Sequence, residues 1–437
     1  MQHKSVAIVG AGWAGCAAAV SLARRGISVT LFEAARVAGG RARRVELDGL
    51  SLDNGQHILL GAYRDTLKLM RQVGLQPEAL LLRLPLQMRY GRGDDGMDLI
   101  AARLPAPLHL MLGVLRARGL RMEDKLALAR FASAARWMGW QLDVDCSVIE
   151  LLARFEQTER VYQLMWRPLC IAALNTAPEQ ASAKVFLAVL RDSLGANRAA
   201  SDMLLPRVDL SALLPDAAIA WLQKNGQSVA MGSRVQQLQQ VGHTWYVVAD
   251  HTTQAFDAVI VATSAPHAHA LLSPLDTALA NTLIFEHAPI TTCYLQYASS
   301  VRLPAPMLAL RDNPENNAWG QYVFDRGQLN SSQAGLFAVV ISDSGAAASL
   351  SQDVLEGHVV TQLSNALQMP ELLVPRWRKT ITEKRATFVC SPNLKRPSNA
   401  TPHAGLWLAG DYTESEYPAT IESAVRSGLK AASACCD

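Results

Sequence analysis

Three glycines near the start of this 437-residue chain have the spacing needed to bind a dinucleotide. Gly10, Gly12 and Gly15 form the pattern G-x-G-x-x-G. The first glycine permits a tight turn, the second lets the backbone approach a pyrophosphate, and the third lets a helix pack close to a strand. Glu33 follows Gly15 by eighteen residues, close to the spacing of a carboxylate that binds a ribose hydroxyl. These residue types predict binding of a dinucleotide through its phosphates and one ribose.

The elements that must position these glycines can be predicted from the same stretch. Residues 5–9 are mostly β-branched and predict a buried strand, residues 14–25 are rich in Ala and Leu and predict a helix, and residues 27–32 predict a second strand. The helix N-terminus would present free N–H groups to the phosphates. A glycine-rich turn without a ligand is the alternative, and the complete order of strand, helix, strand and acid argues against it. The predicted cofactor contacts of this unit are Gly10, Ala11, Gly12, Ala14, Gly15, Glu33 and Ala34.

Two further motifs could contact the same ligand. Gly39 and Gly40 permit close backbone approach, and Arg41 follows them with a planar donor group suited to phosphate. A surface turn with a solvated arginine would explain this pattern equally well if it stood alone. Asp53–His57 is a polar turn after a predicted strand at 45–52, and it could present backbone amides to a ring system. These motifs add Gly40, Arg41, Asn54, Gly55 and Gln56 to the predicted cofactor site.

Composition limits the classes of function. The chain is 50% hydrophobic and 18% charged with a net charge of +3, which predicts a globular protein of two interleaved domains. No basic run alternates with aromatic residues, so we expect no nucleic-acid partner. The seven cysteines are scattered without a C-x-x-C, which argues against a disulfide framework and a zinc site and favours a reducing cytoplasm. The histidines at 267, 269 and 287 lack regularly spaced carboxylates, so we expect no metal.

The N-terminal motifs resemble those of a known superfamily. The dinucleotide fingerprint, E-A-x4-G-G-R and D-x-G-x-H resemble the N-terminal third of the phytoene desaturases and flavin amine oxidases. The resemblance implies that FAD, and not NAD, is the cofactor. It also implies that Gly410 and Asp411, after a predicted strand, support the ribityl and phosphate groups, and that a final helix begins beside the flavin ring at Tyr417–Ala424. A strand–helix unit that only packs on the sheet is the alternative. Val235, Ala419, Thr420 and Ile421 complete the predicted FAD contacts.

The predicted fold is an α/β Rossmann-type FAD-binding domain with an inserted α+β substrate domain, as in the amine oxidases and phytoene desaturases. We expect residues 1–75, 208–265 and 376–437 to form the FAD-binding domain, and residues 76–207 and 266–375 to form the substrate-binding domain. Outside the first motif, helices are predicted at 104–120, 125–140, 181–194, 217–225 and 353–367, and strands at 228–231, 236–240, 244–249, 257–263, 291–297, 336–342 and 406–411.

The chain from end to end is similar to the hydroxysqualene dehydroxylases of hopanoid and squalene biosynthesis. This closer resemblance rests on Asp53–His57, Trp166–Thr176, Glu383–Phe388, Ala409–Thr413 and Tyr417–Ala424. It implies that reduced FAD gives a hydride to an allylic cation formed from hydroxysqualene by loss of water. The implied partner is a long-chain isoprenoid substrate, and the electron donor that reduces FAD is not predicted.

Candidates for the acid or orienting group are His57 and Tyr412, since both stand in motifs predicted to lie beside the flavin. A core histidine bonded to backbone is the alternative for His57, and Asp202 is a weaker candidate. Two other functions stay open. A carotenoid-type desaturase would use the same fold with oxidised FAD, so the redox state that reacts discriminates the two. A flavin-binding partner of a prenyl synthase would bind FAD without turnover.

An apolar segment suggests contact with a membrane surface. Residues 104–120 are rich in Leu and Met, and Arg116, Arg118 and Arg121 follow. An interfacial helix with its arginines toward lipid headgroups explains this composition, and so does a core helix with a solvated basic end. No apolar run is long enough to span a bilayer. The apolar stretch after Lys4 is not interpreted as a signal peptide, since its glycines fit the dinucleotide pattern. We therefore expect a cytoplasmic protein, peripheral on the inner face of the cell membrane.

Overall fold

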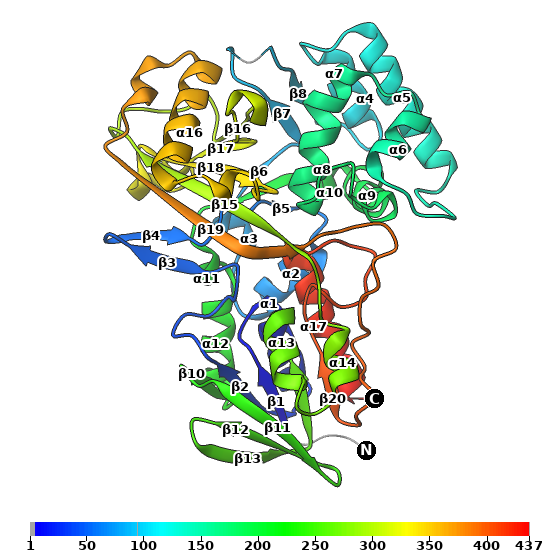
Figure 1. The fold of residues 1–437 in the computed structure, drawn as a ribbon, viewed down its shortest axis with the longest axis vertical. Helices are drawn as coiled ribbons and strands as arrows, with labels where there is room; N and C mark the ends of the chain where they lie inside the picture. The colour runs from blue at the N-terminus through cyan, green and yellow to red at the C-terminus, as the bar shows by residue number, and fades with distance from the viewer. Residues whose placement is uncertain (1–4, 94, 437) are drawn as a thin grey trace.

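The computed structural model describes residues 5–93 and 95–436 and has two connected parts. A parallel sheet with its helices forms one end of the elongated molecule, and the first and last described elements, β1 and α17, belong to it (Figure 1). An antiparallel sheet and a group of helices form the other end.

Five parallel strands form the sheet on which the predicted cofactor motifs are carried. Their order is β10–β2–β1–β14–β20, and every neighbouring pair is parallel. Their bounds are β1 Ser5–Val9, β2 Ser28–Glu33, β10 Ser228–Met231, β14 Ala258–Val261 and β20 Leu406–Leu408. The strands β1 and β14 are almost wholly buried, because helices pack on the sheet, and this explains their continuous apolar runs. The helices of this part include α1 Trp13–Arg24, α2 Arg64–Gln72, α11 Leu210–Leu213, α12 Pro215–Lys224, α13 Ala265–Leu272, α14 Thr277–Asn281 and α17 Ile421–Cys436. The predicted Rossmann-type fold is confirmed.

A three-stranded antiparallel meander connects β10 to β14. It consists of β11 Val235–Val241, β12 Thr244–Ala249 and β13 Thr252–Phe256. The first two were predicted at 236–240 and 244–249. The third was missed, although Asp250 and His251 both have positive φ in a two-residue turn of the kind that joins hairpin strands.

A five-stranded antiparallel sheet is the centre of the second part. Its order is β16–β17–β18–β15–β19, with bounds β16 Met307–Ala309, β17 Tyr322–Asp325, β18 Leu336–Ser342, β15 His287–Gln296 and β19 Trp377–Phe388. The helix α16 (Gln352–Leu367) packs on it through Leu355, Val359 and Leu363. The first insertion contributes most of the helices beside this sheet, namely α4 Leu108–Arg116, α5 Met122–Trp137, α6 Val148–Arg154, α7 Glu159–Val161, α8 Arg167–Leu174, α9 Ala183–Leu190 and α10 Arg198–Ser201.

Several short elements complete the fold. A small sheet has the order β5–β9–β6, with β5 Leu59–Leu60, β9 Met203–Pro206 and β6 Leu81–Leu84, and β7 (Gln87–Arg89) pairs with β8 (Asp98–Ile100). The helices α3 (Pro77–Leu80) and α15 (Arg326–Leu329) are single turns.

The predicted strand at 45–52 was wrong in form, because it is a hairpin. The strands β3 (Arg44–Leu47) and β4 (Leu50–Asp53) pair antiparallel around Asp48 and Gly49, which both have positive φ. Asp-Gly between apolar runs is a strong hairpin signal. The hairpin ends at Asp53 and so leads directly into the polar turn at Asn54–His57.

Several predicted helices were too long. The helix expected at 104–120 covers only Leu108–Arg116, because Pro105 and Pro107 precede it and Gly119 has φ +79° beyond it. The last helix begins at Ile421 and not at Tyr417, since Thr420 is its cap.

The third predicted FAD-binding segment begins with a strand of the antiparallel sheet. This segment was expected to start at residue 376; β19 pairs with β15 in the antiparallel sheet, and the segment reaches the parallel sheet only at β20. All three predicted segments nonetheless contribute strands to the parallel sheet. The division into an FAD-binding and a substrate-binding domain stays a prediction.

Candidate cofactor site

The three glycines of the fingerprint stand at the carboxyl end of β1. Gly10 has φ +108°, a conformation that favours glycine, and it makes the turn into α1. A Cβ on Gly15 would lie 1.9 Å from the carbonyl oxygen of Gly10. The predicted roles of the first and third glycines in the turn and in helix packing are therefore confirmed.

The N-terminus of α1 has the character of an anion site. Gly12 is its cap residue, no described side chain caps it, and its first turn holds no acidic residue. First-turn N–H groups have no partner within a helix, so those at Ala14 and Gly15 can bind phosphate.

A second glycine loop approaches this helix terminus. The N–H of Gly39 donates to the carbonyl of Ala11 at 2.9 Å. A Cβ on Gly40 would lie 3.4 Å from Cα of Gly12. Backbone from both loops therefore lines the same space, and this close approach without side chains fits a pyrophosphate.

Glu33 ends β2 beside this loop. One carboxylate oxygen accepts the N–H of Ala11 at 2.7 Å, and the other accepts the N–H of Ala35 at 2.8 Å, just after Ala34. Each oxygen keeps a further lone pair for a ribose hydroxyl. The N–H of Ser233 donates to the carbonyl of Glu33 at 2.8 Å, so Val235, at the start of β11, lies close to the end of β2.

Arg41 and Asp411 meet although 370 residues separate them in sequence. A guanidinium nitrogen of Arg41 lies 2.6 Å from the carboxylate of Asp411, and the other terminal nitrogen donates to the carbonyl of Ala386 at 2.6 Å. Burial alone would lower the pKa of Arg41, but Asp411 raises it above its ordinary value, so the cation is permanent. The side chain is about one-third exposed, and its remaining donors fit a phosphate.

The polar turn after β4 is held by Glu383, a residue to which the sequence analysis assigned no role. The side-chain amide of Asn54 donates to the carbonyl of Arg41 at 3.2 Å and to the carboxylate of Glu383 at 3.0 Å. Glu383 and the carbonyl of Ala386 belong to β19, within the stretch E-K-R-A-T-F. This stretch carried part of the family resemblance without an assigned role. Its role here is to hold the two N-terminal motifs against the second part of the molecule.

The middle motif contacts the same strand. The amide of Asn175 donates to the hydroxyl of Thr387 at 2.9 Å and to the carbonyl of Ala288 at 3.2 Å. Asn175 itself has φ +48° and ends α8, which asparagine tolerates well. The residues of Trp166–Thr176 therefore bind β15 and β19 from the helical side.

His57 is held by its own turn. Its Nδ1 lies 2.8 Å from the carbonyl of Gly55. A carbonyl can only accept, so Nδ1 carries the proton and Nε2 keeps a lone pair. Burial lowers the pKa of His57 below its ordinary value, and Arg41 lowers it further, against the bond to Gly55. His57 is thus neutral near pH 7 and suits an orienting role better than that of an acid.

Tyr412 has a buried hydroxyl with no hydrogen-bond partner among the described residues. Its ring packs near Phe285, with centroids 6.4 Å apart, and Phe285 in turn packs on Phe388. A Cβ on Gly410 would lie 2.4 Å from this ring, so only glycine allows the packing. Burial raises the pKa of Tyr412 above its ordinary value and keeps the hydroxyl protonated.

A second buried hydroxyl also lacks a partner among these residues. It belongs to Thr292 on β15, and its oxygen lies 3.7 Å from a Cβ built on Gly55. Buried hydroxyls without partners are rare in folded proteins. Together with Tyr412 and the glycine loops, Thr292 fits a polar ring system bound beside the turn at Asn54–His57.

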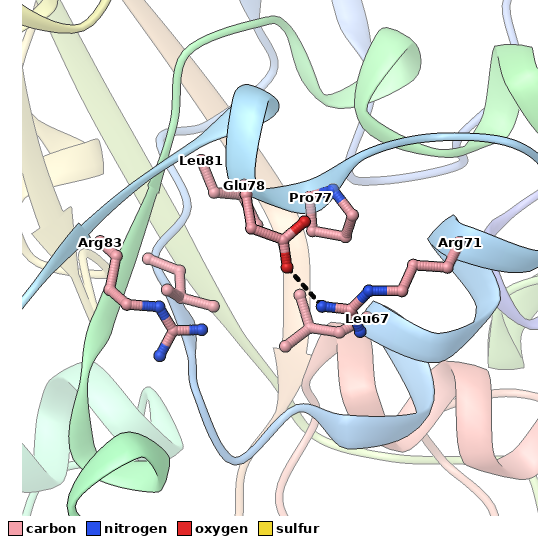
Figure 2. Close-up of a pocket in the computed structure, with 7 residues that line it drawn as sticks. Leu67, Arg71, Pro77, Glu78, Leu81 and Arg83 are labelled. Atoms are coloured by element: carbon pink, nitrogen blue, oxygen red, sulfur yellow. Dashed lines mark hydrogen bonds and ion pairs between the residues drawn. The ribbon is translucent and has the colours of Figure 1, made fainter.

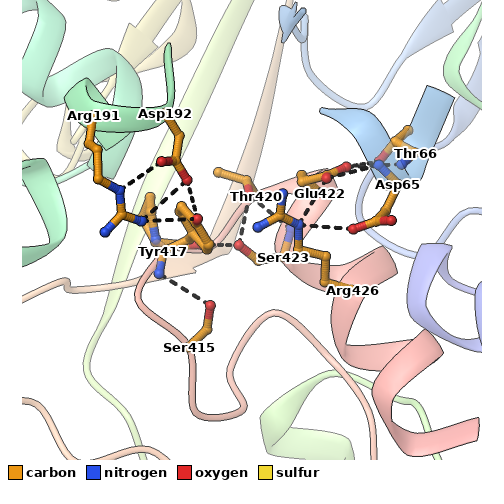
Figure 3. Close-up of polar contacts among 11 residues, drawn as sticks. Asp65, Thr66, Arg191, Asp192, Ser415, Tyr417, Thr420, Glu422, Ser423 and Arg426 are labelled. Carbon is orange, nitrogen blue, oxygen red and sulfur yellow. Dashed lines mark hydrogen bonds and ion pairs between the residues drawn. The ribbon is translucent and has the colours of Figure 1, made fainter. Parts of the chain in front are cut away.

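The start of α17 is held from both parts of the molecule (Figure 3). The hydroxyl of Thr420 accepts the N–H of Ser423 at 3.1 Å, which caps the helix directly after Ala419 and before Ile421. The hydroxyl of Tyr417 donates to Asp192, and the guanidinium of Arg426 lies 4.8 Å from the Tyr417 ring centroid. Asp192 comes from a π-helical turn after α9, so the insertion fixes this loop directly.

Glu422, in the motif Tyr417–Ala424, joins α17 to α2. Its carboxylate is buried, accepts the N–H of Thr66 at 3.0 Å and binds Arg426 at 2.9 Å. It therefore caps the N-terminus of α2 from α17.

Two candidate residues from the sequence analysis have side chains that bind arginines of the protein itself. The side-chain oxygen of Gln56 accepts from Arg326 at 3.2 Å, and the weaker candidate Asp202 pairs with Arg83 at 3.0 Å. Near that region lies a small hollow lined by Leu67, Pro77 and Leu81, with the ion pair Arg71–Glu78 across it (Figure 2). Its volume of about 20 Å³ admits one water and no cofactor.

The comparisons with known proteins agree with this arrangement. Residues 13–436 match the family model for flavin containing amine oxidoreductases. The chain is 30% identical to a hydroxysqualene dehydroxylase of Rhodopseudomonas palustris, over 99% of this chain and 98% of the relative. The chain belongs to the hydroxysqualene dehydroxylase family, within the flavin-containing amine oxidoreductases. It is a flavin-dependent oxidoreductase.

The chain is also similar to other flavin-dependent enzymes and to a further hydroxysqualene dehydroxylase. A hydroxysqualene dehydroxylase of Sinorhizobium fredii is 28% identical over 98% of this chain and 97% of its own length. A probable zeta-carotene desaturase of Synechococcus elongatus is 24% identical over 98% of each chain. Among solved structures, a putative protoporphyrinogen oxidase from Exiguobacterium superposes with a TM-score of 0.70 at 15% identity, over 99% of this chain and 98% of that one. At this identity the likeness concerns the fold alone.

Metal-binding clusters and membrane-spanning helices are both absent from the described residues. No group of three or more His, Cys, Asp and Glu side chains gathers in residues 5–93 and 95–436 as a metal site would require. None of the helices described there is both long and apolar enough to cross a bilayer.

Proposed function

We propose that this protein binds FAD and reduces hydroxysqualene to squalene. The observation that carries the proposal is that the motifs of the family resemblance contact one another. Arg41 binds Asp411, and Asn54 binds Glu383, so four separate motifs meet around one site. The full-length similarity to hydroxysqualene dehydroxylases supports the same reaction.

The residues present fit FAD. The helix terminus at Gly12 and the loop at Gly40 would hold the pyrophosphate, Glu33 would bind the adenosine ribose, and Asp411 with Arg41 would support the ribityl phosphate side. The turn at Gly55 and the start of α17 would border the flavin ring. When bound and reduced, FAD supplies the hydride that the reaction needs.

The chain must supply a proton and orient the leaving hydroxyl. The allylic C–O bond breaks as the hydroxyl takes a proton and leaves as water, and the carbon takes the hydride. The buried hydroxyl of Tyr412 is protonated and has no acceptor in the described chain, so it can donate to the leaving oxygen. The Nε2 lone pair of His57 can accept from the same hydroxyl and orient it. Solvent then returns the proton to Tyr412.

Exclusion of water protects the allylic cation. Phe285, Phe388 and Tyr412 form an aromatic group next to the Arg41–Asp411 pair, and Phe388 and Tyr412 are almost fully buried. A water molecule at the cation would return the alcohol. The apolar wall therefore favours hydride capture over rehydration.

An anaerobic single-turnover experiment tests the proposal. The FAD-loaded protein is reduced, mixed with hydroxysqualene in detergent, and followed by flavin absorbance and lipid analysis. The expected result is reoxidation of the flavin with one squalene formed per flavin. A reduced flavin that stays reduced in the presence of hydroxysqualene would overturn the proposal.

A carotenoid-type desaturase is the second candidate, favoured by the similarity to the zeta-carotene desaturase of Synechococcus elongatus. This reaction runs in the opposite direction, because oxidised flavin takes hydride from a C–H bond. Bleaching of oxidised flavin by a carotenoid precursor would identify it. If neither lipid changes the absorbance of the oxidised or the reduced flavin, the protein is better explained as a flavin-binding partner without turnover.

A further inference from the structure

Exposed apolar side chains are concentrated on one region of the second part. Of fifteen large apolar residues that are exposed in the described chain, ten lie between residues 100 and 149. Leu108, Met111 and Leu115 of α4 are 50%, 55% and 60% exposed, and Met122 and Leu126 of α5 are 68% and 61% exposed. Single exposed apolar residues are ordinary, but a group of this size marks an interaction surface.

The helix α4 is oriented with its apolar face outward. Residues 108, 111 and 115 are three and four apart, so they share one face. The opposite face carries His109 and Gly113, which are buried. A surface helix of a globular protein normally has the reverse arrangement, with apolar residues inward.

Contacts on the inner face hold this orientation. Nε2 of His109 lies 3.2 Å from the hydroxyl of Ser201, and a Cβ on Gly113 would lie 2.9 Å from the carbonyl of Ile100. The ammonium of Lys125 donates to the carbonyl of Leu115 at 2.8 Å and joins α5 to the end of α4. The helix therefore cannot turn its apolar face inward without losing these contacts.

Basic residues border the apolar face. Arg103 precedes α4, Arg116 ends it, and Arg118 and Arg121 follow, all exposed. No acidic residue occurs between Asp98 and Glu123. This pairing of an apolar face with an arginine border is complementary to the acyl boundary and the anionic headgroups of a bilayer. A protein partner would need no such uniform charge.

We infer that α4 and the start of α5 form a docking surface for an anionic lipid bilayer. The surface consists of Leu104, Leu108, Met111, Leu115, Met122 and Leu126 with its border of arginines. It lies at the end of the molecule opposite the parallel sheet (Figure 1). The inference deepens the proposed function, because an isoprenoid substrate dissolves in the bilayer, and it assigns the segment that docks.

Vesicle sedimentation tests the surface without any substrate. Purified holoprotein is mixed with vesicles of phosphatidylcholine alone or with phosphatidylglycerol at low and high salt. The expected result is binding to the anionic vesicles that weakens with salt. The variant Leu108→Ser/Met111→Ser/Leu115→Ser should bind about tenfold or more weakly. Replacing Arg116, Arg118 and Arg121 by Gln should weaken binding to anionic vesicles roughly a hundredfold and leave binding to neutral vesicles unchanged.

A matched control has equally exposed apolar residues elsewhere. Val241→Ser/Ile284→Ser/Val374→Ser alters side chains that are 63%, 65% and 81% exposed, and it should bind vesicles as the wild type does. Flavin content and thermal unfolding show that each variant is folded. Equal vesicle binding by the wild type and the Leu108→Ser/Met111→Ser/Leu115→Ser variant would overturn the inference. Because dehydroxylation is measured in detergent, docking and the proposed reaction can fail separately.

Discussion

The guanidinium of Arg41 and the carboxylate of Asp411 lie 2.6 Å apart and join the two ends of the chain at the predicted phosphate site. Asp411 follows β20 and Arg41 follows the second glycine loop, so this pair fixes the C-terminal motif against the N-terminal one. The same arginine binds the carbonyl of Ala386 on β19 and so ties both motifs to the antiparallel sheet.

Loss of this pair should weaken FAD binding. We expect Arg41→Ala and Asp411→Ala each to raise the Kd for FAD about ten- to a hundredfold, because each removes charge-assisted hydrogen bonds that orient the site. The double variant should be little worse than either single one, since both remove the same contact. Fluorescence titration of the apoprotein measures this. The control is Arg71→Ala, whose partner Glu78 is exposed. Additive losses would show that the two residues act independently.

Removal of the Tyr412 hydroxyl should slow the chemical step and leave the flavin bound. We expect Tyr412→Phe to reduce the single-turnover rate roughly a hundredfold or more, because the leaving hydroxyl loses its proton donor. His57→Gln should reduce it less, since a neutral His57 only orients. Stopped-flow absorbance of reduced flavin measures both rates. Full rates in both variants with FAD bound would exclude these two residues from catalysis.

Asp53 should make folding stability depend on pH. Its carboxyl is 4% exposed, and burial raises its pKa to about 7, although Arg326 and the N–H of Leu210 oppose the shift. Below about pH 4 both folded and unfolded states carry the proton. As pH rises from there to 7 only the unfolded state releases it, so stability falls, by ~4 kcal/mol in all.

The variant Asp53→Asn should therefore gain stability relative to the wild type as pH rises. Between pH 5 and pH 8 we expect the difference in free energy of unfolding to change by ~3 kcal/mol in favour of Asn. Urea unfolding at the two pH values measures it. Glu46→Gln, on the same hairpin but exposed, serves as the control. If the free energies of unfolding of the wild type and Asp53→Asn change equally with pH, Asp53 is ionised in the folded protein over this whole range.

Two helical glycines should respond oppositely to alanine. A Cβ on Gly428 in α17 would lie 2.1 Å from the carbonyl of Ala14 in α1, whereas a Cβ on Gly357 in α16 meets nothing within 4 Å. We expect Gly428→Ala to destabilise the protein by about 1–3 kcal/mol through overpacking. Gly357→Ala should stabilise it by about 0.5–1 kcal/mol, because alanine favours helix. Thermal unfolding distinguishes them, and equal shifts would contradict the close packing of α1 on α17.

The local units of the cofactor site could be predicted from sequence, because their information lies within short stretches. Gly10, Gly12, Gly15 and Glu33 occur within 24 residues, and strand, turn and helix preferences there agree with one another. The hairpin at Asp48 and Gly49 is equally local, because Asp-Gly between two apolar runs signals a tight turn. The FAD assignment itself came from the family resemblance and not from these spacings.

Long-range contacts could not be predicted in this way. The sequence contains Glu383 and Asn54, but only the pairing of β19 with β15 brings them within 3.0 Å. Strand propensity carries no information about which partner a strand selects, so the pairing of residue 383 with β15 could not be predicted. The unpartnered hydroxyls of Tyr412 and Thr292 likewise depend on which side chains surround them.

The sequence by itself thus determined the dinucleotide unit, since the required conformations are set by glycine positions and by apolar periodicity over a few turns. It also predicted a strongly apolar surface within residues 104–120, with an interfacial helix and a core helix both open. Only the tertiary structure decided that the apolar face of α4 points outward, since periodicity groups residues and does not show what covers them. The same holds for Arg41 and Asp411, whose meeting depends on how three separate segments assemble one parallel sheet.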